Sequence, residues 1–381
     1  MARVVLIRSN PVSPDPPVEK MANALLGLGH SVHIIGWDRS SDYPAETDTI
    51  IMRNGNARIT RFGIKATFGG GLKGNLKPLY LFQKNLSRWL NENKSEIDIV
   101  HAFDFDTGFV AERFTKRNGI KLVYHMLDYY IDSHNLGKGI LRDIVRKLEN
   151  KVIEEADATI ICTEKRKEQI AGSKAKRLYV IHNTPDVQSI DPNITVIKSK
   201  DKDKMKIVYV GILANSRMLR EMAEIVANDT RYEFHIGGFG KLESVFDEYA
   251  KKYENIYFYG KLPYAKTLAL EKECDVMVAI YDPSVRNNQY SAPNKFYESL
   301  MIGKPIIMAK GTGFDSIIDE NSIGITVDFS KDGIRRGFEE LLDKKENWHS
   351  CGTKAKLLYS NEYSWSIMER RIQEIYESIL S

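Results

Sequence analysis

The feature that most constrains this chain is an alternation of apolar segments with helical segments, which runs through the sequence twice. In the first half, apolar runs lie at residues 2–9, 31–37, 98–104 and 121–127. The alternation begins again at residue 205 and continues to about residue 329. Near-continuous apolar strands that alternate with helices are typical of parallel sheets buried on both faces. The sequence therefore predicts an α/β protein with two doubly wound, Rossmann-like domains in tandem.

A polar stretch separates the two halves. Residues 187–204 read VQSIDPNITVIKSKDKDK, which is typical of a linker, and we expect a hinge there. The expected division is then a first domain over residues 1–186, a second over 205–362 and a last amphipathic helix over 363–381. In such folds ligands bind at the carboxyl ends of the strands, so the loops that follow the strands are the first place to look for function.

Charge is distributed unevenly along the 381 residues. The whole chain has a formal net charge of +4, but residues 1–200 hold 30 Lys and Arg against 23 Asp and Glu, and the remainder holds 25 against 28. The basic first half indicates contact with something anionic, such as a phospholipid surface or a phosphorylated acceptor. The mild overall balance and the absence of any nucleic-acid motif argue against nucleic acid as a partner.

The cysteines and the apolar runs indicate the cellular compartment in which we expect the protein. No run of eighteen apolar residues is present, so we expect no transmembrane helix, and the apolar part of the N-terminus is too short for a signal peptide. Cys162, Cys274 and Cys351 are isolated, and no Cys/His cluster suggests a metal site. We therefore expect reduced thiols in a cytoplasmic protein.

The segment SAPNKFYESLMIGKPII, residues 291–307, predicts a helix followed by a buried strand. Ser291 and Asn294 can cap the start of the helix, and Gly303 can end it in the left-handed conformation. Apolar residues recur along this helix at helical spacing, and Lys295 and Glu298 fall on the opposite face. Taken alone, the two side chains are either a solvated ion pair or part of the wall of a ligand site.

The order of motifs in the second half adds a resemblance. The motifs are KIVYVG, FHIGGFG, IYFYGKLPY, CDVMVAIYDPS, SAPNKFYESLMIGKPII and YSWSIMERRIQEIY. In this order they resemble the GT-B-fold, family-4-type (group 1) retaining glycosyltransferases, and in the first half the resemblance is one of architecture. It implies that the second domain binds a nucleotide-sugar, that the first binds the acceptor, and that the last helix packs back on the first domain. The apolar residues of that helix are Trp365, Ile367, Met368, Ile372 and Ile375.

The resemblance also implies roles for residues of the donor domain. Glu298 would hold the ribose hydroxyls, while Lys295 and the helix N-terminus would hold the diphosphate. Gly211 would let the backbone approach a phosphate, and Arg217 would clamp the diphosphate. Further donor contacts are expected from Gly238, Lys261, Leu262, Ser291, Ala292 and Asn294.

Two positions depart from the family pattern. Ile212 stands where a common arginine follows the glycine, and Tyr290 stands where a glutamate usually contacts the donor sugar. With Ile212 in place of the arginine, the expected phosphate-binding site has one positive side chain fewer. The second leaves the identity of the sugar open.

In the first domain, three polar residues follow strands. We expect His125 and Asp128 beside the reacting sugar, and Asp104 together with Asp128 on the acceptor side; a structural or loop-capping role is the alternative for each. The implied reaction is transfer with retention, in which Arg217 and Lys295 stabilise the departing diphosphate. It needs no protein nucleophile, no cofactor and no metal.

Two rival functions remain at this point, and the acceptor is a further question. The rivals are a nucleotide-sugar epimerase of the same architecture and a non-catalytic sugar-binding protein. Residues 53–88 mix basic and apolar side chains, which is typical either of a segment that contacts anionic membrane or of a core helix with a solvated basic face. The first interpretation predicts a lipid-linked glycan acceptor at the inner face of the plasma membrane, in surface polysaccharide or glycolipid assembly.

Overall fold

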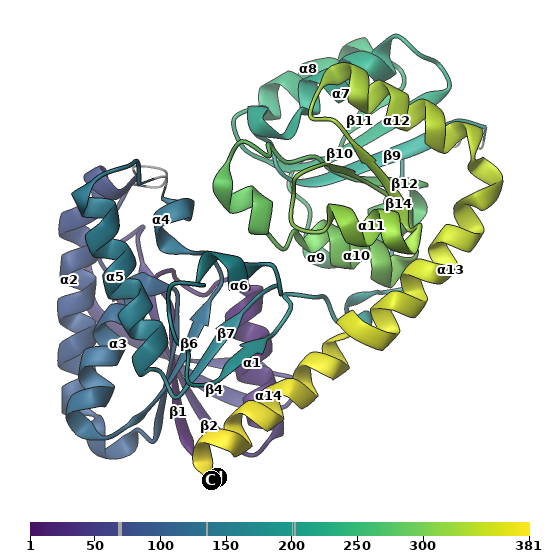
Figure 1. Ribbon diagram of the computed structural model, residues 1–381. Helices are drawn as coiled ribbons and strands as arrows, with labels where there is room; N and C mark the ends of the chain where they lie inside the picture. Colours follow the sequence, from purple (N-terminus) through teal and green to yellow (C-terminus); the bar gives the residue numbers. More distant parts are fainter. Residues whose placement is uncertain (68–70, 135, 200, 202) are drawn as a thin grey trace. The chain divides into compact units, whose positions relative to one another are not determined.

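The computed structural model describes residues 1–67, 71–134, 136–199, 201 and 203–381. The chain forms two compact units, one of Met1–His182 with Met368–Ser381 and one of Asn183–Ile367 (Figure 1). Each unit is a layered α/β structure around its own sheet. The predicted pair of Rossmann-like domains is therefore confirmed. None of the helices in these described ranges is long and apolar enough to cross a membrane.

The sheet of the first unit has eight strands in the order β3-β4-β2-β1-β5-β6-β7-β8. Seven of them are parallel, and the six that the sequence predicts have mostly buried apolar side chains. These six strands are β1 (Arg3–Ile7), β2 (Ser31–Asp38), β5 (Ile99–Phe103), β6 (Lys121–Met126), β7 (Ala158–Ile161) and β8 (Leu178–Val180). Their carboxyl ends meet at one edge of the sheet, where β2, β1, β5 and β6 are successive neighbours.

The sequence did not predict the two remaining strands. β3 (Tyr43–Met52) and β4 (Gly55–Gly63) form an antiparallel hairpin, and β4 pairs with β2 in parallel. Most side chains of β3 are exposed, so the strand has no apolar run to identify it. Because β3 lies at the edge of the sheet, solvent covers one side of its backbone and polar residues are tolerated.

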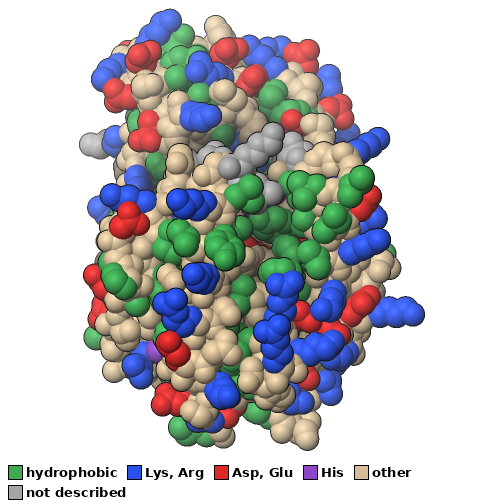
Figure 2. Space-filling view, turned by 90° about the vertical axis from the view of Figure 1, so that its left-hand side faces the viewer, with side chains coloured by type: hydrophobic (Ala, Val, Ile, Leu, Met, Phe, Trp, Pro, Cys, Tyr) green, Lys and Arg blue, Asp and Glu red, His purple; other side chains and the backbone are tan. Residues whose placement is uncertain are grey.

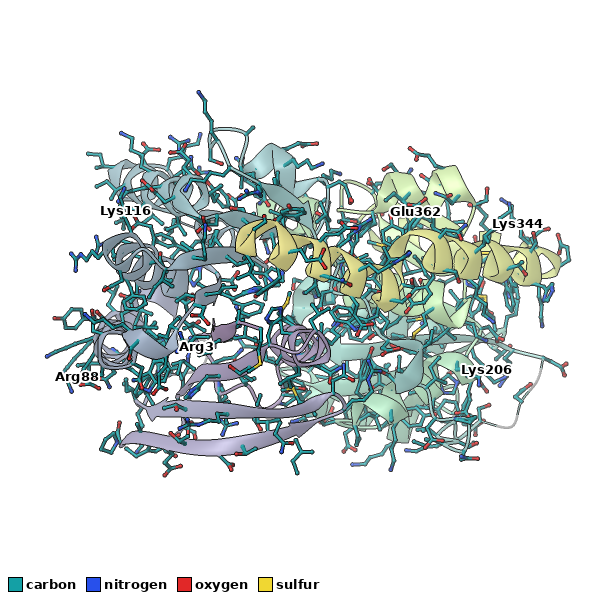
Figure 3. All side chains as sticks on the ribbon, turned by 90° about the horizontal axis from the view of Figure 1, so that it is seen from below. Arg3, Arg88, Lys116, Lys206, Lys344 and Glu362 are labelled. Atoms are coloured by element: carbon teal, nitrogen blue, oxygen red, sulfur yellow. The ribbon has the colours of Figure 1, made fainter. Side chains whose placement is uncertain are left out.

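The helices of the first unit cover both faces of this sheet. Figure 1 shows α2 (Gly71–Glu92), α3 (Phe105–Asn118) and α5 (Ile140–Glu155) on one face and α1 (Pro16–Gly27) on the other. Arg88 and Lys116 point away from the outer sides of α2 and α3 (Figure 3). The short helices are α4 (Tyr130–Ser133), α6 (Arg166–Gln169) and the 3₁₀ turns η1 (Lys94–Glu96) and η2 (Val187–Ser189), of which η2 belongs to the second unit.

The last helix, α14 (Trp365–Leu380), contributes residues from Met368 onward to the first unit. Its apolar side chains Met368, Ile372 and Ile375 are buried. The Tyr376 hydroxyl lies 2.8 Å from His101 Nδ1, and Arg371 donates to the Val180 carbonyl at 3.0 Å. The helix is thus held by polar contacts as well as by its apolar face.

The second unit has a six-stranded parallel sheet in the order β11-β10-β9-β12-β13-β14. The strands are β9 (Met205–Ile212), β10 (Tyr232–Phe239), β11 (Ile256–Phe258), β12 (Val276–Ala279), β13 (Ile306–Ala309) and β14 (Gly324–Val327). The helices are α7 (Leu219–Ala227), α8 (Glu243–Lys252), α9 (Tyr264–Glu273), α10 (Asn294–Ile302), α11 (Asp315–Asn321), α12 (Lys331–Asp343) and α13 (Trp348–Leu358). Short turns η3 (Asn215–Arg217), η4 (Arg286–Tyr290), η5 (Lys345–Asn347) and η6 (Tyr359–Tyr363) complete it.

The segment predicted to be a hinge is attached to the second unit. The backbone N–H groups of Val196 and Ile197 both donate to Glu273 at 2.9 Å, and Ser199 Oγ donates to Glu233 at 2.8 Å. The described part of the segment is thus bonded to the second unit at these three residues, and the hinge expected over residues 187–204 stays a prediction. The structure divides the chain earlier, after His182.

Candidate functional site

The helix α10 is buried along its whole length after the first residue. Its left-handed end at Gly303 (φ 78°) is as predicted, but no described side chain caps its start, because Ser291 Oγ donates to the Asn288 carbonyl instead. Lys295 is 9 % exposed and Glu298 is 3 % exposed. The interpretation as a solvated ion pair is wrong, because α9 and β9 cover the face that the helical pattern leaves polar.

The Lys295 ammonium lies among aromatic rings and carboxylates. Its Nζ is 4.7 Å from the centre of the Tyr209 ring. Burial by itself lowers the pKa of Lys295, but the surrounding Tyr209, Tyr281, Glu298 and Glu271 raise it overall. Since the phenols are neutral at ordinary pH, the Glu298 carboxylate is the neighbour that keeps this buried amine charged.

Arg217 lies next to the same aromatic pair. It ends the turn that follows β9, and its guanidinium sits 3.6 Å from the centre of the Tyr281 ring. The charges of Lys295 and Arg217 both act on the hydroxyl of Tyr209. The structure therefore brings the two predicted cations together at the carboxyl end of β9, where two positive groups can meet one anionic ligand.

Two glycines make room for this arrangement. A Cβ on Gly211 would lie 2.9 Å from Lys295 Nζ, so any larger residue would displace the ammonium. Gly238, at φ 131°, lies against the backbone of Gly211, whose carbonyl a Cβ would meet at 1.8 Å. A side chain at Gly238, in β10, would thus meet backbone, whereas one at Gly211, at the end of β9, would have to move the Lys295 side chain.

Glu298 has a carboxylate neighbour that the sequence did not indicate. Glu271 of α9 is 1 % exposed, and its two carboxylate oxygens have no hydrogen-bond partner among the described residues. Burial first, and then the charge of Glu298, raise the pKa of Glu271 well above its ordinary value, while Lys295 opposes the shift. The hydroxyl of Tyr264 hydrogen-bonds to Glu298. Two acids and one amine therefore form a compact buried cluster.

The other predicted donor residues lie around this cluster at the surface. Lys261 Nζ is 5.3 Å from the Phe239 ring, and Leu262 packs against Gly237. Ala292 packs against the core. Asn294 is exposed and accepts a hydrogen bond from Asn183 Nδ2 at 3.0 Å. None of these contacts joins them to Lys295.

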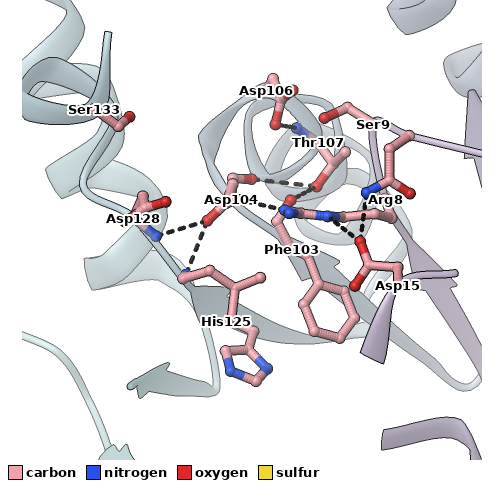
Figure 4. A network of polar contacts seen from close by, with 12 residues as sticks. Arg8, Ser9, Asp15, Phe103, Asp104, Asp106, Thr107, His125, Asp128 and Ser133 are labelled. Atoms are coloured by element: carbon pink, nitrogen blue, oxygen red, sulfur yellow. Dashed lines mark hydrogen bonds and ion pairs between the residues drawn. The ribbon is translucent and has the colours of Figure 1, made fainter. Parts of the chain in front are cut away.

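A second polar arrangement lies in the first unit, at the carboxyl ends of β1 and β5 (Figure 4). The Arg8 guanidinium lies between two carboxylates and forms ion pairs with Asp104 and Asp15. Asp104 also accepts the N–H groups of Leu127 and Asp128, at 2.8 and 3.1 Å. It adopts a positive φ of 61°, which is uncommon for a residue with a side chain and is stabilised by these contacts.

Asp128 is held at the carboxyl end of β6 by a buried arginine. The Arg166 guanidinium, only 1 % exposed, donates to Asp128 at 2.8 Å. Asp104 and Asp128 both line a cavity of about 640 Å³, together with Asp106, Arg39 and Tyr130. The predicted acceptor-side residues are therefore neighbours, although the sequence did not indicate Arg8 or Arg39.

His125 does not belong to this cavity. Its ring points away from Asp104 and Asp128 (Figure 4), stacks on Phe103 and lies 3.2 Å from His101 Nε2. Burial, and secondarily the charge of Arg8, lower the pKa of His125 to about 3. The alternation of side chains along β6 turns His125 into the sheet interior, so the structural alternative for this histidine is the better supported one. Among the described residues, no group of three His, Cys, Asp or Glu side chains could hold a metal ion.

Comparison with known proteins gives a consistent picture. Residues 18–189 match the model of Glycosyltransferase Family 4, and residues 191–358 match that of Glycosyl transferases group 1. An uncharacterized glycosyltransferase of Methanocaldococcus jannaschii is 22 % identical over 308 residues, which are 74 % of this chain and 77 % of the relative.

Two solved structures show the same fold at low identity. Sucrose-phosphate synthase from Thermosynechococcus elongatus has a TM-score of 0.78 and 14 % identity, and the match covers 100 % of this chain and 99 % of the synthase. HepE from Anabaena, solved in complex with UDP, has a TM-score of 0.70 and 12 % identity, with 99 % of this chain and 100 % of that one covered. The two family models adjoin each other near residue 190, close to the division between the two units.

Proposed function

Because this chain belongs to the group 1, family-4-type glycosyltransferases with the GT-B fold, we propose that it transfers a sugar from a nucleotide-sugar to a hydroxyl group with retention of configuration. The donor would bind to the second unit. The acceptor would be a glycan or a lipid-linked glycan that binds to the first unit. The proposal rests chiefly on the buried Lys295 and Glu298 and on the half-buried Arg217, whose charge acts with that of Lys295 on Tyr209.

The cluster suits a nucleotide diphosphate for electrostatic reasons. A buried ammonium and an adjacent guanidinium are costly to place together unless they bind an anion. The start of α10 also offers N–H groups that no described side chain caps. A carboxylate such as Glu298 can accept from two vicinal hydroxyls, as in a ribose. The UDP in the HepE complex is a ligand of this chemical class.

In the proposed reaction, the residues stabilise charge and form no covalent bond with the sugar. Lys295 and Arg217 stabilise the negative charge that grows on the diphosphate as the bond to the sugar breaks. The acceptor hydroxyl attacks from the face that the diphosphate leaves, and a phosphate oxygen takes the proton. Retention then needs no protein nucleophile, and the two cations supply the positive charge without a metal or cofactor.

A panel of UDP-, GDP- and ADP-sugars tests the proposal. Thermal unfolding should shift for one nucleotide class, because a ligand at a hundred times its dissociation constant stabilises by about 2.7 kcal/mol. NMR of the reaction products should show a new glycosidic bond, or slow donor hydrolysis, with the configuration of the donor retained. An altered but untransferred sugar would indicate an epimerase, and an unaltered bound ligand would indicate a sugar-binding protein.

The first unit also carries a surface that suits an anionic membrane, and we include peripheral membrane contact in the proposal. Figure 2 shows hydrophobic side chains gathered on one face, with Lys and Arg beside them. The exposed apolar residues come from α2 (Leu76, Tyr80, Leu81) and from the first turns of α5 (Ile140, Leu141, Ile144), and exposed basic residues of the same helices are Lys77, Lys84, Arg88, Arg146 and Lys147. Apolar insertion combined with attraction to anionic lipid is what an interfacial helix needs.

The structure narrows the segment that the sequence suggested for this contact. Phe62 and Phe82 are buried in the core and cannot insert. Phe68, Gly69 and Gly70 lie outside the described residues, as do the side chains of Leu72 and Lys73. Sedimentation with liposomes would test the contact: binding should require anionic lipid and weaken as salt screens the charges. Equal recovery in the supernatant with neutral and anionic vesicles at low salt would contradict it.

A further inference from the structure

The cavity of about 640 Å³ in the first unit is built from four neighbouring strand ends. Arg8 follows β1, Asp38 ends β2, Asp104 and Asp106 follow β5, and Asp128 follows β6. The positions are fixed by the parallel register of these strands. This edge is where ligands bind in doubly wound sheets, so the chemistry of its walls indicates what it binds.

Carboxylates outnumber cations in and directly behind these walls. The lining holds the guanidinium groups of Arg8 and Arg39 and the carboxyl groups of Asp38, Asp104, Asp106 and Asp128, and behind it lie Arg61, Arg166 and Asp15. Burial raises the pKa of Asp104, which Arg8 opposes. Even with Asp104 protonated, three carboxylates of the lining face two guanidinium groups when histidine is counted as neutral. A phosphate would therefore enter a region that already has excess negative charge.

The cations of the cavity are already engaged. Arg8 is paired with both Asp15 and Asp104, and Arg166 is paired with Asp128. The Arg39 guanidinium lies 4.2 Å from the centre of the Trp37 ring and donates to the Ser9 carbonyl at 2.8 Å, with the charge of Asp106 acting on it. Arg8 and Arg166 thus have carboxylate partners, whereas among the described residues Arg39 forms no ion pair and its buried Nε makes no hydrogen bond.

The backbone groups that commonly bind phosphate at such an edge are occupied as well. At the start of α1, the Asp15 carboxylate accepts the Val18 N–H at 3.3 Å. At the start of α3, the Asp106 carboxylate accepts the Thr107 N–H at 3.2 Å. Helix N-termini attract anions, and at α1 the side chain of Asp15 supplies the anion, whereas the N-cap residue of α3, Asp104, makes no side-chain cap bond.

We propose that this cavity binds an uncharged, polyhydroxylated sugar unit of the acceptor and excludes a phosphorylated one at this position. The inference rests on the proposed function and narrows its substrate class. Asp38, Asp106 and Asp128 can accept from sugar hydroxyls through charge-assisted bonds, and the amide of Asn10 lines the same wall. The rings of Tyr130 and His134, stacked with centroids 3.9 Å apart, give a flat wall for a sugar ring.

The test compares matched neutral and charged probes on the full chain. Binding of the methyl glycosides of glucose, galactose and mannose is measured by NMR titration against the corresponding hexose 6-phosphates. At least one glycoside should bind, and its phosphate should bind about 10-fold more weakly or worse, equivalent to about 1.4 kcal/mol. Tighter binding of the phosphates, or saturable binding of neither set, would overturn the proposal.

Two variants and one control sharpen the comparison. Asp106→Asn keeps the shape of the wall and removes one charge, so it should weaken the glycoside about 10-fold and reduce the discrimination against phosphate. Asp38→Asn should act in the same direction. Asp48→Asn, on the exposed strand β3, should change neither ratio. An unchanged ratio in both cavity variants would overturn the proposal.

Nucleotide-sugar binding, measured on the same samples, distinguishes failure of the neutral-sugar cavity from failure of the proposed function. A preference for phosphorylated sugars with intact nucleotide-sugar binding would reject only the neutral-sugar cavity. Absence of nucleotide-sugar binding would reject the proposed function itself.

Discussion

The carboxyl edges of the two sheets share one architecture and differ in electrostatics. In the first unit, Arg8 is neutralised by Asp15 and Asp104, and the start of α1 is capped by a carboxylate. In the second unit, Lys295 and Arg217 lie beside neutral tyrosines, and no described side chain caps the start of α10. At the first edge Arg8 is paired with two carboxylates, whereas at the second edge the two cations lie against aromatic rings, with Glu298 and Glu271 near Lys295.

The difference comes from a few residues at equivalent points of the fold. Asp15 precedes the prolines that begin α1, and Pro293 with Asn294 and Lys295 begins α10. The strand–loop–helix geometry brings helix starts to the sheet edge in both units. Under the two proposals, the side chain placed there decides whether the edge binds hydroxyl groups or phosphates.

The largest expected effect is that of removing the cation of the second edge. Lys295→Gln should slow turnover by about 10² to 10³, the range for loss of one group that stabilises transition-state charge. It should also lower the free energy of unfolding, because Glu298 loses its buried counter-ion. Steady-state kinetics and urea unfolding measure the two effects.

Lys266→Gln, an exposed change on the neighbouring α9, is the matched control and should alter neither quantity. Activity of Lys295→Gln within a few-fold of the wild type would reject the role given to the second edge.

A change at the first edge should affect stability more than donor binding. Asp104→Ala removes one partner of Arg8 and the acceptor for two backbone N–H groups, so unfolding should become easier by about 3–5 kcal/mol. Affinity for the nucleotide-sugar should stay at the wild-type value. Titration calorimetry at a temperature well below unfolding would measure this affinity. For Glu298→Gln we expect donor affinity to decrease about 10-fold or more. An equal loss of donor affinity in Asp104→Ala would remove the distinction between the two edges.

Glu271 provides a test inside the second edge. Its raised pKa means that the folded state retains a proton that the unfolded chain releases, so its contribution makes stability fall as pH rises above about 4.5. The slope is about 1.4 kcal/mol per pH unit while the folded state remains protonated and the unfolded chain is ionised. Glu271→Gln should remove this slope and stabilise the protein at neutral pH, and unfolding curves between pH 5 and 8 would show it. An unchanged pH profile would mean that Lys295 keeps Glu271 ionised.

The comparison also shows which parts of the molecule could be predicted from the sequence. The end of α10 at Gly303 and the glycine beside Lys295 follow from local backbone requirements, and both were predictable. The burial of Lys295 and Glu298 was not, because the residues that cover them come from α9 and β9. Glu271 and Tyr264 carry no local signal, since a glutamate or tyrosine on a helix is usually exposed. The hairpin of β3 and β4 escaped prediction because an edge strand needs no apolar face.

His125 gives the smallest and last of these tests, and it separates a structural histidine from a catalytic one. The unfolded chain binds a proton near pH 6.5, whereas the folded state does so only near pH 3, so stability is full above pH 6.5 and is lost as pH falls towards 3. His125→Phe should remove part of this acid sensitivity, about 2 kcal/mol at pH 5, and it should cost about 1 kcal/mol at pH 8 through the lost bond to His101. The pH dependence of turnover should not change, because the ring points away from the cavity (Figure 4). If turnover instead became about 100-fold slower while stability stayed the same, His125 would belong among the catalytic groups and the first edge would take part in the chemistry.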